Sequence, residues 1–436
     1  MARANVKGMS DQESAGPAPS ATGGFGRAGR PVRQGALRGH NLGLALRIVA
    51  EAATPVSRAR IAAITGLTRA TASTLVDTLL AGRLVREVEL PRTSRSGRPA
   101  VGLVLAPGGP GGLGLELNVD YVAATVVDLT GSVVFHEVVA ADQRLLDPPE
   151  ALSRTAALAC AGLDAAAAKG VEVCGVALAL PGLVEPGRGR LLLAPNLGWR
   201  DVDVAGLLRR EPRLAALPVS LDNEANYAAL AELASGPQED APDFVHLSGE
   251  VGIGAGIVLG GRLFRGSRGW GGEIGHVTVD PAGPPCSCGA RGCLEQYAGQ
   301  EAILRRAGLS GSAATSLGGE PTIRLLVQRA ADGDADLLAA LADAANALGV
   351  VVAGMVNLLD VGTVVLGGIY GPLAPWIQPA VEAELAARVL WSAWAPPRVR
   401  IATKGPESAV LGAATSVVSG VLADPATWLG RGTLRA

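Results

Sequence analysis

Residues 271–299, GGEIGHVTVDPAGPPCSCGARGCLEQYAG, decide the fold of this 436-residue chain and most of its functional interpretation. The stretch holds one His, two Glu and three of the five Cys of the chain. Cys286, Cys288 and Cys293 supply three thiolates, and His276, ten positions before the first of them, supplies an imidazole. These four ligands can close a tetrahedron around zinc and leave no open position for a reactive water. The pattern therefore predicts a structural zinc site.

The alternative is that these thiols are unrelated buried or free cysteines, as we expect Cys160 and Cys174 to be. A Cys-x-Cys pair with a further Cys and a His nearby favours a metal site, because this spacing brings several soft ligands to one ion. Gly289 and Gly292 allow the sharp turns that such convergence needs. We therefore expect a zinc loop over residues 276–293.

Length and composition indicate a multidomain protein of the cytoplasm. A chain of 436 residues exceeds one typical core, and 48% hydrophobic residues suffice for two or three packed domains. Five Cys in so long a chain do not form a disulfide framework. The N-terminus has no apolar signal-peptide core. No apolar run is expected to reach membrane-spanning length, since GVALALPGLV breaks at Pro181, so we expect no membrane partner.

The net charge of −2 conceals a basic front and an acidic body. Residues 1–110 contain 15 Lys and Arg against 6 Asp and Glu, a net charge of +9. The rest contains 23 basic and 34 acidic residues, a net charge of −11. A basic front favours a polyanionic partner. A tail at residues 1–38, rich in Gly, Ala, Ser, Pro and Arg, accounts for part of the excess, and we expect it to be disordered.

Residues 39–107 have the pattern of a winged helix-turn-helix domain of the α+β class. Apolar residues recur at helical spacing from Asn41, and residues 57–85 indicate two short helices separated at TGLT. Gly66 suits the turn, and Thr68 can cap the helix that follows. The buried stripe of that helix is expected at Ala72, Leu75, Val76 and Leu79. LVREVEL and AVGLVLA then predict the two strands of a wing with a basic tip between them.

The second helix of such a unit enters the major groove of DNA, where short polar side chains and Arg reach phosphates and base edges. The residues expected to bind double-stranded operator DNA are Arg69, Thr71, Ser73 and Thr74 in the helix and Arg95 and Arg98 in the wing. The alternative is a small helical bundle that mediates protein contacts only. The turn, the hydroxyl-rich helix start and the basic wing together favour DNA.

The body of the chain, residues 111–425, alternates strands and helices and is expected to be α/β. Residues 113–140 indicate a meander of two or three strands with a turn at DLTG. A buried strand with a Gly/Pro-rich loop follows at 172–199, a Gly-rich hairpin at 243–266, and a strand, Gly-rich loop and helix at 361–381. Two halves with similar starts predict a duplicated fold with a cleft between the halves.

GGEIGHVTVD followed by CSCGARGCLEQYAG resembles the two signatures of the ROK family (repressor, open reading frame, kinase), because E-x-G-H and C-x-C-G-x-x-G-C-x-E occur in the family's order and spacing. The resemblance extends over about residues 110–420. With the winged helix in front, the chain is similar to ROK transcriptional regulators of the xylose-repressor type. The resemblance implies an actin-like, sugar-kinase-type body of two lobes, with a sugar in the cleft and a structural zinc.

The resemblance also implies a sugar site, because a polyol requires several fixed acceptors and amides in a concave pocket. The residues that match the family's sugar-contacting positions are Asn196, Asn223, Glu224, Glu273, His276 and Glu295. His276 would bind zinc through one ring nitrogen and a sugar hydroxyl through the other, which ties the metal loop to ligand recognition. For Asn196, a capping or solvated role is an almost equally good interpretation.

Departures from the kinase pattern predict that the protein is not an enzyme. Sugar kinases of this fold open with a phosphate-gripping loop of the type Asp-x-Gly-Gly-Thr, whereas LELNVDYV lacks these glycines and the Thr and contains Glu116 and Asp120. The catalytic Asp of the family's Asn-Asp-x-Asn motif is replaced by Glu224, whose extra methylene displaces the carboxylate. The second phosphate loop, SGEVGIGAG, carries Glu250 beside its glycines.

These features predict a sugar-sensing DNA-binding regulator that represses carbohydrate-utilisation genes and is released by its sugar effector. Two-fold symmetric half-sites imply a homodimer or homotetramer. One alternative is an ATP-dependent hexose kinase, similar to glucokinases, with an appended DNA-binding domain. Another is a regulator that responds to a protein partner instead of a sugar.

Overall fold

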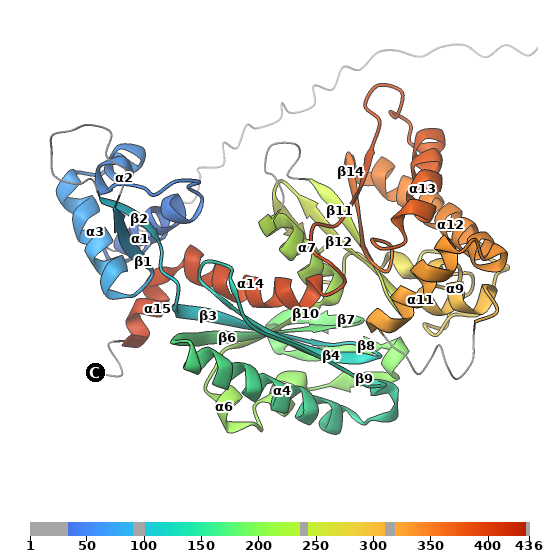
Figure 1. Cartoon of the computed structure of the whole chain (residues 1–436), viewed down its shortest axis with the longest axis horizontal. Helices are drawn as coiled ribbons and strands as arrows, with labels where there is room; N and C mark the ends of the chain where they lie inside the picture. Colours follow the sequence, from blue (N-terminus) through green and yellow to red (C-terminus); the bar gives the residue numbers. More distant parts are fainter. Residues whose placement is uncertain (1–33, 90–100, 236–242, 310–318, 433–436) are drawn as a thin grey trace, which may run out of the picture.

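The computed structural model describes residues 34–89, 101–235, 243–309 and 319–432. These residues form a small N-terminal unit joined to a large body of two lobes (Figure 1). We expect residues 1–38 to be a disordered tail, and residues 1–33 of it lie outside the described residues. For residues 34–38 the expectation is wrong, because helix α1 spans Gln34–Ala50. Its first turns contain no proline, and Gln, Ala, Leu and Arg are good helix formers.

The N-terminal unit is a winged helix-turn-helix, as the sequence predicts. Its remaining elements are α2 (Arg58–Thr65), α3 (Arg69–Ala81), β1 (Val85–Glu89) and β2 (Val101–Leu105). Gly66 ends α2 in the left-handed region with a φ of 72°, and the hydroxyl oxygen of Thr68 accepts a hydrogen bond from the amide of Thr71 (3.2 Å). All four residues of the predicted apolar stripe on α3 are buried, and β1 and β2 pair antiparallel.

The first lobe is built on a mixed five-stranded sheet with the strand order β10-β6-β3-β4-β5. Its strands are β3 (Gly109–Leu117), β4 (Tyr121–Asp128), β5 (Val133–Ala140), β6 (Val171–Leu180) and β10 (Val219–Asn223). The first three form the predicted antiparallel meander, whereas β6 runs parallel to β3 and β10 runs parallel to β6. Helix α4 (Pro148–Ala168) covers one face of this sheet, and α14 (Ser408–Ala423) covers the other (Figure 1).

The segment after β6, expected to be a Gly/Pro-rich loop, contains regular structure that the sequence does not predict. A second, antiparallel sheet consists of β7 (Leu183–Glu185), β8 (Arg190–Ala194) and β9 (Trp199–Val202). Two short helices follow, α5 (Val204–Leu208) and α6 (Pro212–Ala215). Leu191 and Trp199 are buried in the core of the first lobe and hold these strands in place. Strands of three to five residues between Gly and Pro are too short to show a periodic pattern.

The second lobe repeats the architecture of the first, with the strand order β13-β12-β11-β14-β15. Its strands are β11 (Phe244–Gly249), β12 (Ile253–Leu259), β13 (Arg262–Phe264), β14 (Thr363–Gly368) and β15 (Arg398–Ile401). Its helices are α8 (Glu295–Ala298), α9 (Gln300–Arg306), α11 (Gly319–Ala331), α12 (Ala335–Leu359) and α13 (Ala374–Arg388). In each lobe, the first three strands pair antiparallel, and the last two strands pair parallel on the other edge of the first strand. This shared order confirms the predicted duplication.

Two helices cross between the lobes. Helix α7 (Glu224–Ser235) follows β10 of the first lobe but packs on β11 and β12 of the second. Helix α14 follows β15 of the second lobe but packs on β3 and β6 of the first. They touch closely, because a Cβ added to Gly412 in α14 would lie 1.8 Å from the carbonyl oxygen of Tyr227 in α7. This crossing packs the two lobes together at the base of the cleft.

The winged helix shares a core with the first lobe. Its buried residues pack with Val127 of β4 and with Val418 and Val421 of α14. A last described helix, α15 (Pro425–Gly432), returns to the winged helix beyond the predicted end of the body at residue 425. The indole nitrogen of Trp428 in this helix donates a hydrogen bond to the carbonyl of Gly82 (3.2 Å). The winged helix and the body are thus packed against each other as well as linked by the chain.

Helix α12 is long and apolar enough in composition to cross a membrane, so the expectation that no segment reaches this length is wrong. It contains no proline or other break, and 61% of its most apolar window is buried. Leu341, Leu348 and Val352 of this helix lie in the core of the second lobe. A helix buried in a protein core has the same composition as one that crosses a membrane.

Candidate functional site

The outer surface of α3 presents three of the four helical residues expected to bind DNA. Arg69, Thr71 and Thr74 are exposed. Ser73 is half-buried, and its carbonyl oxygen accepts a hydrogen bond from Arg58 of α2 (3.4 Å). The expected wing contacts lie outside the described residues: Arg95 and Arg98. The described surface therefore offers one guanidinium and two hydroxyl groups at the start of the helix that enters the groove in proteins of this kind.

The four expected metal ligands converge. One ligand atom from each of His276, Cys286, Cys288 and Cys293 lies within 4.8 Å of the other three. The sulfurs of Cys288 and Cys293 are 3.8 Å apart, and Nδ1 of His276 is 3.8 Å from the sulfur of Cys286. Sulfurs bound at about 2.3 Å to a tetrahedral zinc are separated by roughly 3.8 Å. The cluster could therefore hold a metal ion.

The thiol chemistry of this cluster fits a bound cation. Burial, together with hydrogen bonds to the thiols of Cys288 and Cys286, raises the pKa of Cys293 to about 12. The thiols of this cluster are therefore protonated unless the positive charge of a bound metal ion stabilises the thiolates. As expected, Cys174 lies outside the cluster, and its buried thiol donates to the carbonyl of Gly111 (3.1 Å).

Glycine gives the metal loop its shape. Gly292 has a φ of 64°, and a Cβ at this position would lie 1.6 Å from the carbonyl oxygen of Asp280. Its amide donates to the carbonyl of Pro284 (2.8 Å), and its carbonyl accepts from the amide of Val279 (2.8 Å). These contacts fold the chain back on itself and bring Cys293 towards the other ligands. Only glycine combines this conformation with this close approach.

All six residues expected to contact a sugar line one pocket between the lobes. They are Asn196, Asn223 and Glu224 from the first lobe and Glu273, His276 and Glu295 from the second. The pocket encloses about 40 Å³ in this structure. Pockets that hold small-molecule ligands measure roughly 300–1,000 Å³. A sugar can therefore bind between these side chains only after they move apart.

The amides and carboxyl groups of this pocket are held in place to different degrees. The amide nitrogen of Asn196 donates to Glu295 (3.3 Å), and that of Asn223 donates to the carbonyl of Gly182 (3.1 Å). Oε2 of Glu224 is buried and, within the described part of the chain, has no hydrogen-bond partner. A buried acceptor without a partner is unfavourable unless a ligand supplies the donor. Glu224 is therefore poised to receive a ligand hydroxyl.

Burial changes the charge state of this pocket. It raises the pKa of Glu224 to about 8, with further contributions from the nearby Glu116 and Glu273. Burial also raises the pKa of Glu273 and Glu295, whereas His276 opposes the shift in both. A protonated carboxyl group can donate as well as accept a hydrogen bond. The pocket therefore offers both kinds of partner that a sugar hydroxyl needs.

The metal cluster and this pocket are neighbours. His276 belongs to both, and Nδ1 is the ring nitrogen that faces the cluster. The sulfur of Cys286 lies 4.0 Å from Oε1 of Glu295, which also lines the pocket. The hydroxyl of Ser287, between two of the metal ligands, donates to the side-chain oxygen of Asn196 (3.1 Å). A shift of the metal loop would therefore move three residues of the pocket.

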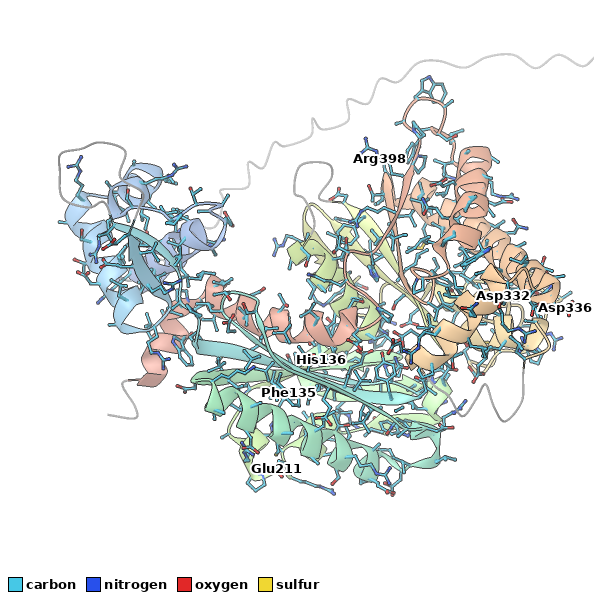
Figure 2. All side chains as sticks on the ribbon, in the orientation of Figure 1. Phe135, His136, Glu211, Asp332, Asp336 and Arg398 are labelled. Atoms are coloured by element: carbon cyan, nitrogen blue, oxygen red, sulfur yellow. The ribbon has the colours of Figure 1, made fainter. Side chains whose placement is uncertain are left out.

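The turn between β3 and β4, where sugar kinases grip phosphate, is filled by the protein's own side chains. Glu116 is fully buried, and its carboxylate accepts hydrogen bonds from the hydroxyl of Tyr121 (2.7 Å) and from the amide of Val410 (3.1 Å) at the start of α14. Next to it, Glu407 pairs with His136 of β5 (2.7 Å), which lies on the side of the sheet towards α14 (Figure 2). A helix N-terminus that could attract an anion is thus already occupied by a carboxylate.

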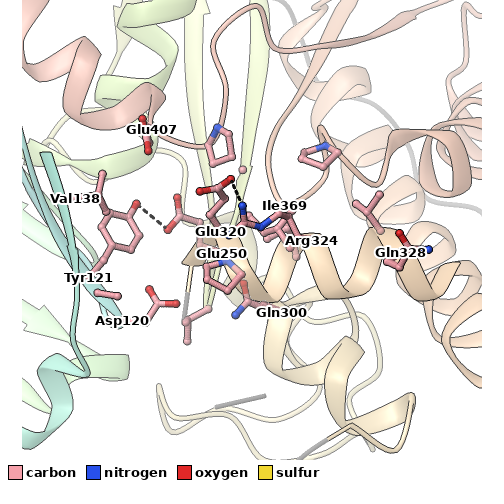
Figure 3. A pocket seen from close by; sticks show the side chains of 18 residues that line it. Asp120, Tyr121, Val138, Glu250, Gln300, Glu320, Arg324, Gln328, Ile369 and Glu407 are labelled. Carbon is pink, nitrogen blue, oxygen red and sulfur yellow. Dashed lines mark hydrogen bonds and ion pairs between the residues drawn. The ribbon is translucent and has the colours of Figure 1, made fainter. Parts of the chain in front are cut away.

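Glu250 joins the two lobes across the cleft. Its carboxyl group, on the turn between β11 and β12, accepts a hydrogen bond from the amide of Asn118. Its Oε2 also lies 3.4 Å from the hydroxyl oxygen of Tyr121 (Figure 3). Burial raises the pKa of Glu250 well above its ordinary value, and Glu116 and Glu224 add to the shift. Three carboxyl groups therefore lie close together where the kinase pattern places phosphates.

Two further residues of this region were missed from the sequence. Asp222, in the LDNEAN motif, is buried and accepts hydrogen bonds from Arg265 (2.8 Å) and Asn226 (2.7 Å). Arg265 follows β13 of the second lobe, so the ion pair spans both lobes. The motif showed that Asp222 is polar at a strand end, but no local signal identifies a partner 43 residues away.

A DNA-binding winged helix on a duplicated, actin-like body with a His/Cys metal loop defines a class of protein related to the sugar kinases. Two family models match this chain: the ROK family over residues 112–419 and the IclR helix-turn-helix domain over residues 44–89. The first match covers more than half of the chain. The protein belongs to the ROK family.

Proteins similar to this chain include both regulators and kinases. It is 31% identical to the xylose repressor of Caldicellulosiruptor bescii over 323 residues, which cover 72% of this chain and 79% of that protein. It is 33% identical to the glucokinase of Halalkalibacterium halodurans over 250 residues, which cover 55% of this chain and 75% of that protein. The crystal structure of a ROK family transcriptional regulator, a homologue of the Escherichia coli MLC protein, matches with a TM-score of 0.73 at 26% identity and covers 90% of this chain and 99% of its own.

Proposed function

We propose that the protein is a sugar-responsive DNA-binding repressor of carbohydrate-utilisation genes that acts in the cytoplasm. The observation that carries this proposal is that the winged helix and the lobes around the sugar-type pocket form one packed body, joined through α14 and α15. A change in the pocket can therefore reach the DNA-binding unit through packed elements. The similarity to a xylose repressor and to a ROK transcriptional regulator supports the same function.

The sugar site is proposed at the pocket between the lobes. The residues proposed to hydrogen-bond sugar hydroxyls are Asn196, Asn223, Glu224, Glu273, His276 and Glu295. Because they come from both lobes, a bound sugar would bridge the cleft. It would favour one relative placement of the lobes, and this population shift would weaken the hold of the winged helices on the operator.

The metal proposed for the loop is zinc, in a structural role. Three sulfurs and one imidazole nitrogen at tetrahedral spacing suit zinc better than the oxygen-preferring magnesium or calcium. With all four positions taken by the protein, zinc would supply no reactive water. It would hold the loop that positions His276 and Glu295 beside the sugar.

The DNA interface is proposed on α3 and the wing. The residues proposed to contact operator DNA are Arg69, Thr71, Ser73, Thr74, Arg95 and Arg98. Since operators for such domains are commonly two-fold symmetric, the protein would bind as a homodimer or homotetramer.

Fluorescence anisotropy tests the repressor function. The full chain is titrated onto labelled DNA from upstream of its own gene and of the neighbouring genes, with and without a panel of pentoses, hexoses and amino sugars. The expected result is tight binding that one sugar releases at constant salt, since salt alone changes such affinities. Specific binding that no sugar alters would contradict the sensor half of the proposal, and a lack of specific binding would contradict the whole of it.

We further propose that the protein does not transfer phosphate. Glu116, Asp120 and Glu250 lie where a kinase holds the phosphates of ATP, and these side chains supply neither the positive charge nor the backbone donors of a phosphate loop. Glu224 stands where the family's catalytic base is Asp. A protonated carboxyl group, favoured by its raised pKa, is a poor base near neutral pH.

The alternative is an ATP-dependent hexose kinase with an appended DNA-binding domain, which the similarity to a glucokinase favours. A coupled assay that follows ADP formation over the same sugar panel separates the two functions. Sugar-dependent turnover would establish the alternative. A third possibility, a regulator that senses no sugar and responds to a protein partner, predicts that Glu273→Ala leaves the operator response unchanged.

A further inference from the structure

A cavity of about 870 Å³ lies between the lobes, directly beside the sugar-type pocket (Figure 3). On the first lobe, residues 118–119 line the pocket and residues 120–121 line the cavity. On the second lobe, residues 252–254 line the pocket and residues 250–251 line the cavity. The same two turns, one from each lobe, therefore form walls of both spaces. The proposed repressor function gives the cavity no ligand.

The two spaces meet at contacts that cross from lobe to lobe. The amide of Asn118 donates to the carboxyl group of Glu250, and the hydroxyl oxygen of Tyr121 lies 3.4 Å from the same group. The sugar-type pocket, at about 40 Å³, is too small for a sugar, so its walls must move apart before a sugar can bind. Because the walls belong to different lobes, this movement would also break the contacts of Glu250. The pocket and the cavity would then form one continuous site.

The lining of the cavity is largely apolar. It includes side chains from both lobes: Val138, Val251, Ile323, Val327 and Ile369. Val138 of β5 is 40% exposed, so a ligand in the cavity would cover apolar surface that now faces water. Burial of such surface is favourable, and these walls therefore favour an apolar group.

The charged side chains of the described lining already have partners within the protein. The pairs are Glu250 with Asn118, Glu320 with Arg324 (3.3 Å) and Glu407 with His136 (2.7 Å), and Asp120 also takes part in an interaction within the protein. Burial raises the pKa of Glu250 well above its ordinary value, which favours the neutral carboxyl group. The lining therefore offers no unpaired cation for the phosphates of a nucleotide and no unpaired anion for an ammonium group. A neutral group suits it best.

We propose that the effector is a sugar that carries a neutral apolar group, with the sugar in the sugar-type pocket and the apolar group in the cavity. This inference rests on the proposed sugar response and names the chemical class of its ligand. The apolar group packs against Val138, Ile323 and Ile369. Since one ligand occupies both spaces, it favours the separated lobes more strongly than a free sugar does. The group is attached either through a glycosidic bond or through the primary hydroxyl group of the sugar.

Isothermal titration calorimetry with the full chain tests the proposal and distinguishes the two attachments. The probes are the methyl and phenyl glycosides of D-xylose, D-glucose and N-acetyl-D-glucosamine in both anomers, and the two hexoses acetylated or benzoylated at the primary hydroxyl group. The free sugars are measured beside them. For at least one sugar and one attachment, the probe with the phenyl ring is expected to bind about tenfold or more tightly than its methyl counterpart and the free sugar, because only the ring reaches the apolar walls. Equal affinities within every pair would overturn the proposal.

Two neighbouring residues of β5 place the apolar group. Val138→Asn puts an amide on the apolar wall and is expected to weaken binding of the preferred phenyl probe about fivefold or more, with the affinity for the free sugar unchanged. Val139→Asn is the matched control, because Val139 is 41% exposed, points to the opposite face of the strand and lies outside the described lining. It should bind every probe as the wild type does. Unchanged binding by the Val138 variant, or equal losses in both variants, would overturn the placement.

Operator release by the same probes, followed by fluorescence anisotropy, separates this inference from the proposed function. Free sugars that bind and release the operator as well as the phenyl probes do would overturn the inference and leave the proposed function intact. If neither free nor substituted sugars bind or release the operator, the sugar response itself fails and the inference fails with it. Displacement of a bound phenyl probe by ATP would identify the cavity as a nucleotide site and would also overturn the inference.

Discussion

Glu224 carries a carboxyl group in a place where its charged form is costly. Burial, with contributions from Glu116 and Glu273, raises its pKa to about 8 from an ordinary value of 4.5. Between these pH values the folded protein therefore holds a proton that the unfolded chain has released. The contribution of this group to stability is fully present below about pH 4.5 and is lost as the pH rises through 8.

Glu224→Gln keeps the size of the side chain and removes the titration. The thermal midpoint of the variant at pH 8 is expected to exceed that of the wild type by about 2 °C or more, because the cost of a buried charge disappears. At pH 5 the two proteins should unfold at similar temperatures. Differential scanning calorimetry from pH 5 to 8 measures both, with the exposed Glu137→Gln as control. A variant that is less stable than the wild type at pH 8 would contradict the explanation.

Cys293 contributes one thiol to the metal cluster, whereas Cys160 lies outside it. The wild type is expected to copurify with about one zinc ion per chain, and Cys293→Ser should lose this zinc and unfold about 5 °C or more lower. Cys160→Ser, which also removes one thiol, should keep both the metal and the stability. Elemental analysis by mass spectrometry, together with thermal unfolding, checks the result. Full zinc content in the Cys293 variant would refute the assignment of this ligand.

The residues of the site differ in how well the sequence could predict them. The four metal ligands lie within 18 consecutive residues, 276–293, so their spacing alone predicted that they form one site. The polar residues of the sugar-type pocket are spread over a hundred positions, and only the resemblance to a family indicated that they would meet. Asp222 and Arg265 were missed because these two partners belong to opposite lobes. Contacts between lobes leave no local pattern in a single sequence.

Among the elements, those with a capping signal and an apolar stripe could be predicted. Helices α2 and α3 have both, since Gly66 and Thr68 separate them and α3 buries every third or fourth residue. The strands β7–β9 have neither, because they alternate with Gly and Pro over a few residues each. Helix α15 could not be predicted either, because it is stabilised by packing against the winged helix, more than 300 residues earlier in the chain.

Arg69 lies exposed at the first position of α3, where a cation can meet the DNA backbone or a base edge. Arg69→Ala is expected to weaken operator binding by about 1–3 kcal/mol, which is roughly fivefold to a hundredfold. Arg154→Ala removes an exposed cation, paired with Glu150, from α4 of the body and should bind as the wild type does. Fluorescence anisotropy at a fixed salt concentration compares the two variants. Equal loss in both would indicate that only the overall charge matters.

Trp428 of α15 connects the body to the winged helix through a hydrogen bond and through packing. Trp428→Ala is expected to retain most of the operator affinity but to lose most of its release by sugar, because the path between the two units is weakened. Trp394→Ala truncates an indole that is 83% exposed and should respond normally. Operator titrations with and without the releasing sugar check this. Normal release by the Trp428 variant would show that the coupling takes another route.

For the whole molecule, the duplication explains why the pocket lies where it does. Each lobe places a loop after its first strand at the cleft, and each receives a helix from the other lobe. The pocket of about 40 Å³ is therefore narrow because the lobes are close together, and it can widen if they separate. The fold class and the duplication could be predicted from the order of strands and helices. The narrowness of the pocket could not, because it depends on the distance between lobes.

A two-fold symmetric operator requires two winged helices at once. Sedimentation analysis of the full chain on a duplex with both half-sites is therefore expected to give two or four chains per duplex. A duplex with one half-site should bind more weakly by a factor of about ten or more, because the second contact is lost. One chain per full operator, at saturating protein concentration, would contradict the proposed assembly.

The return of α15 to the winged helix has a consequence for the synthesis of the protein. On the ribosome, the residues of the winged helix emerge first, but their partner Trp428 follows more than 300 residues later. At roughly 5–20 residues per second, this delay lasts about 15–65 seconds. During that time the newly synthesised winged helix exposes the apolar surface that α15 later covers. Translation that stops before codon 425 would give fragments that lack α15 and keep this apolar surface exposed. We expect proteases of the cell to degrade such fragments before they bind an operator.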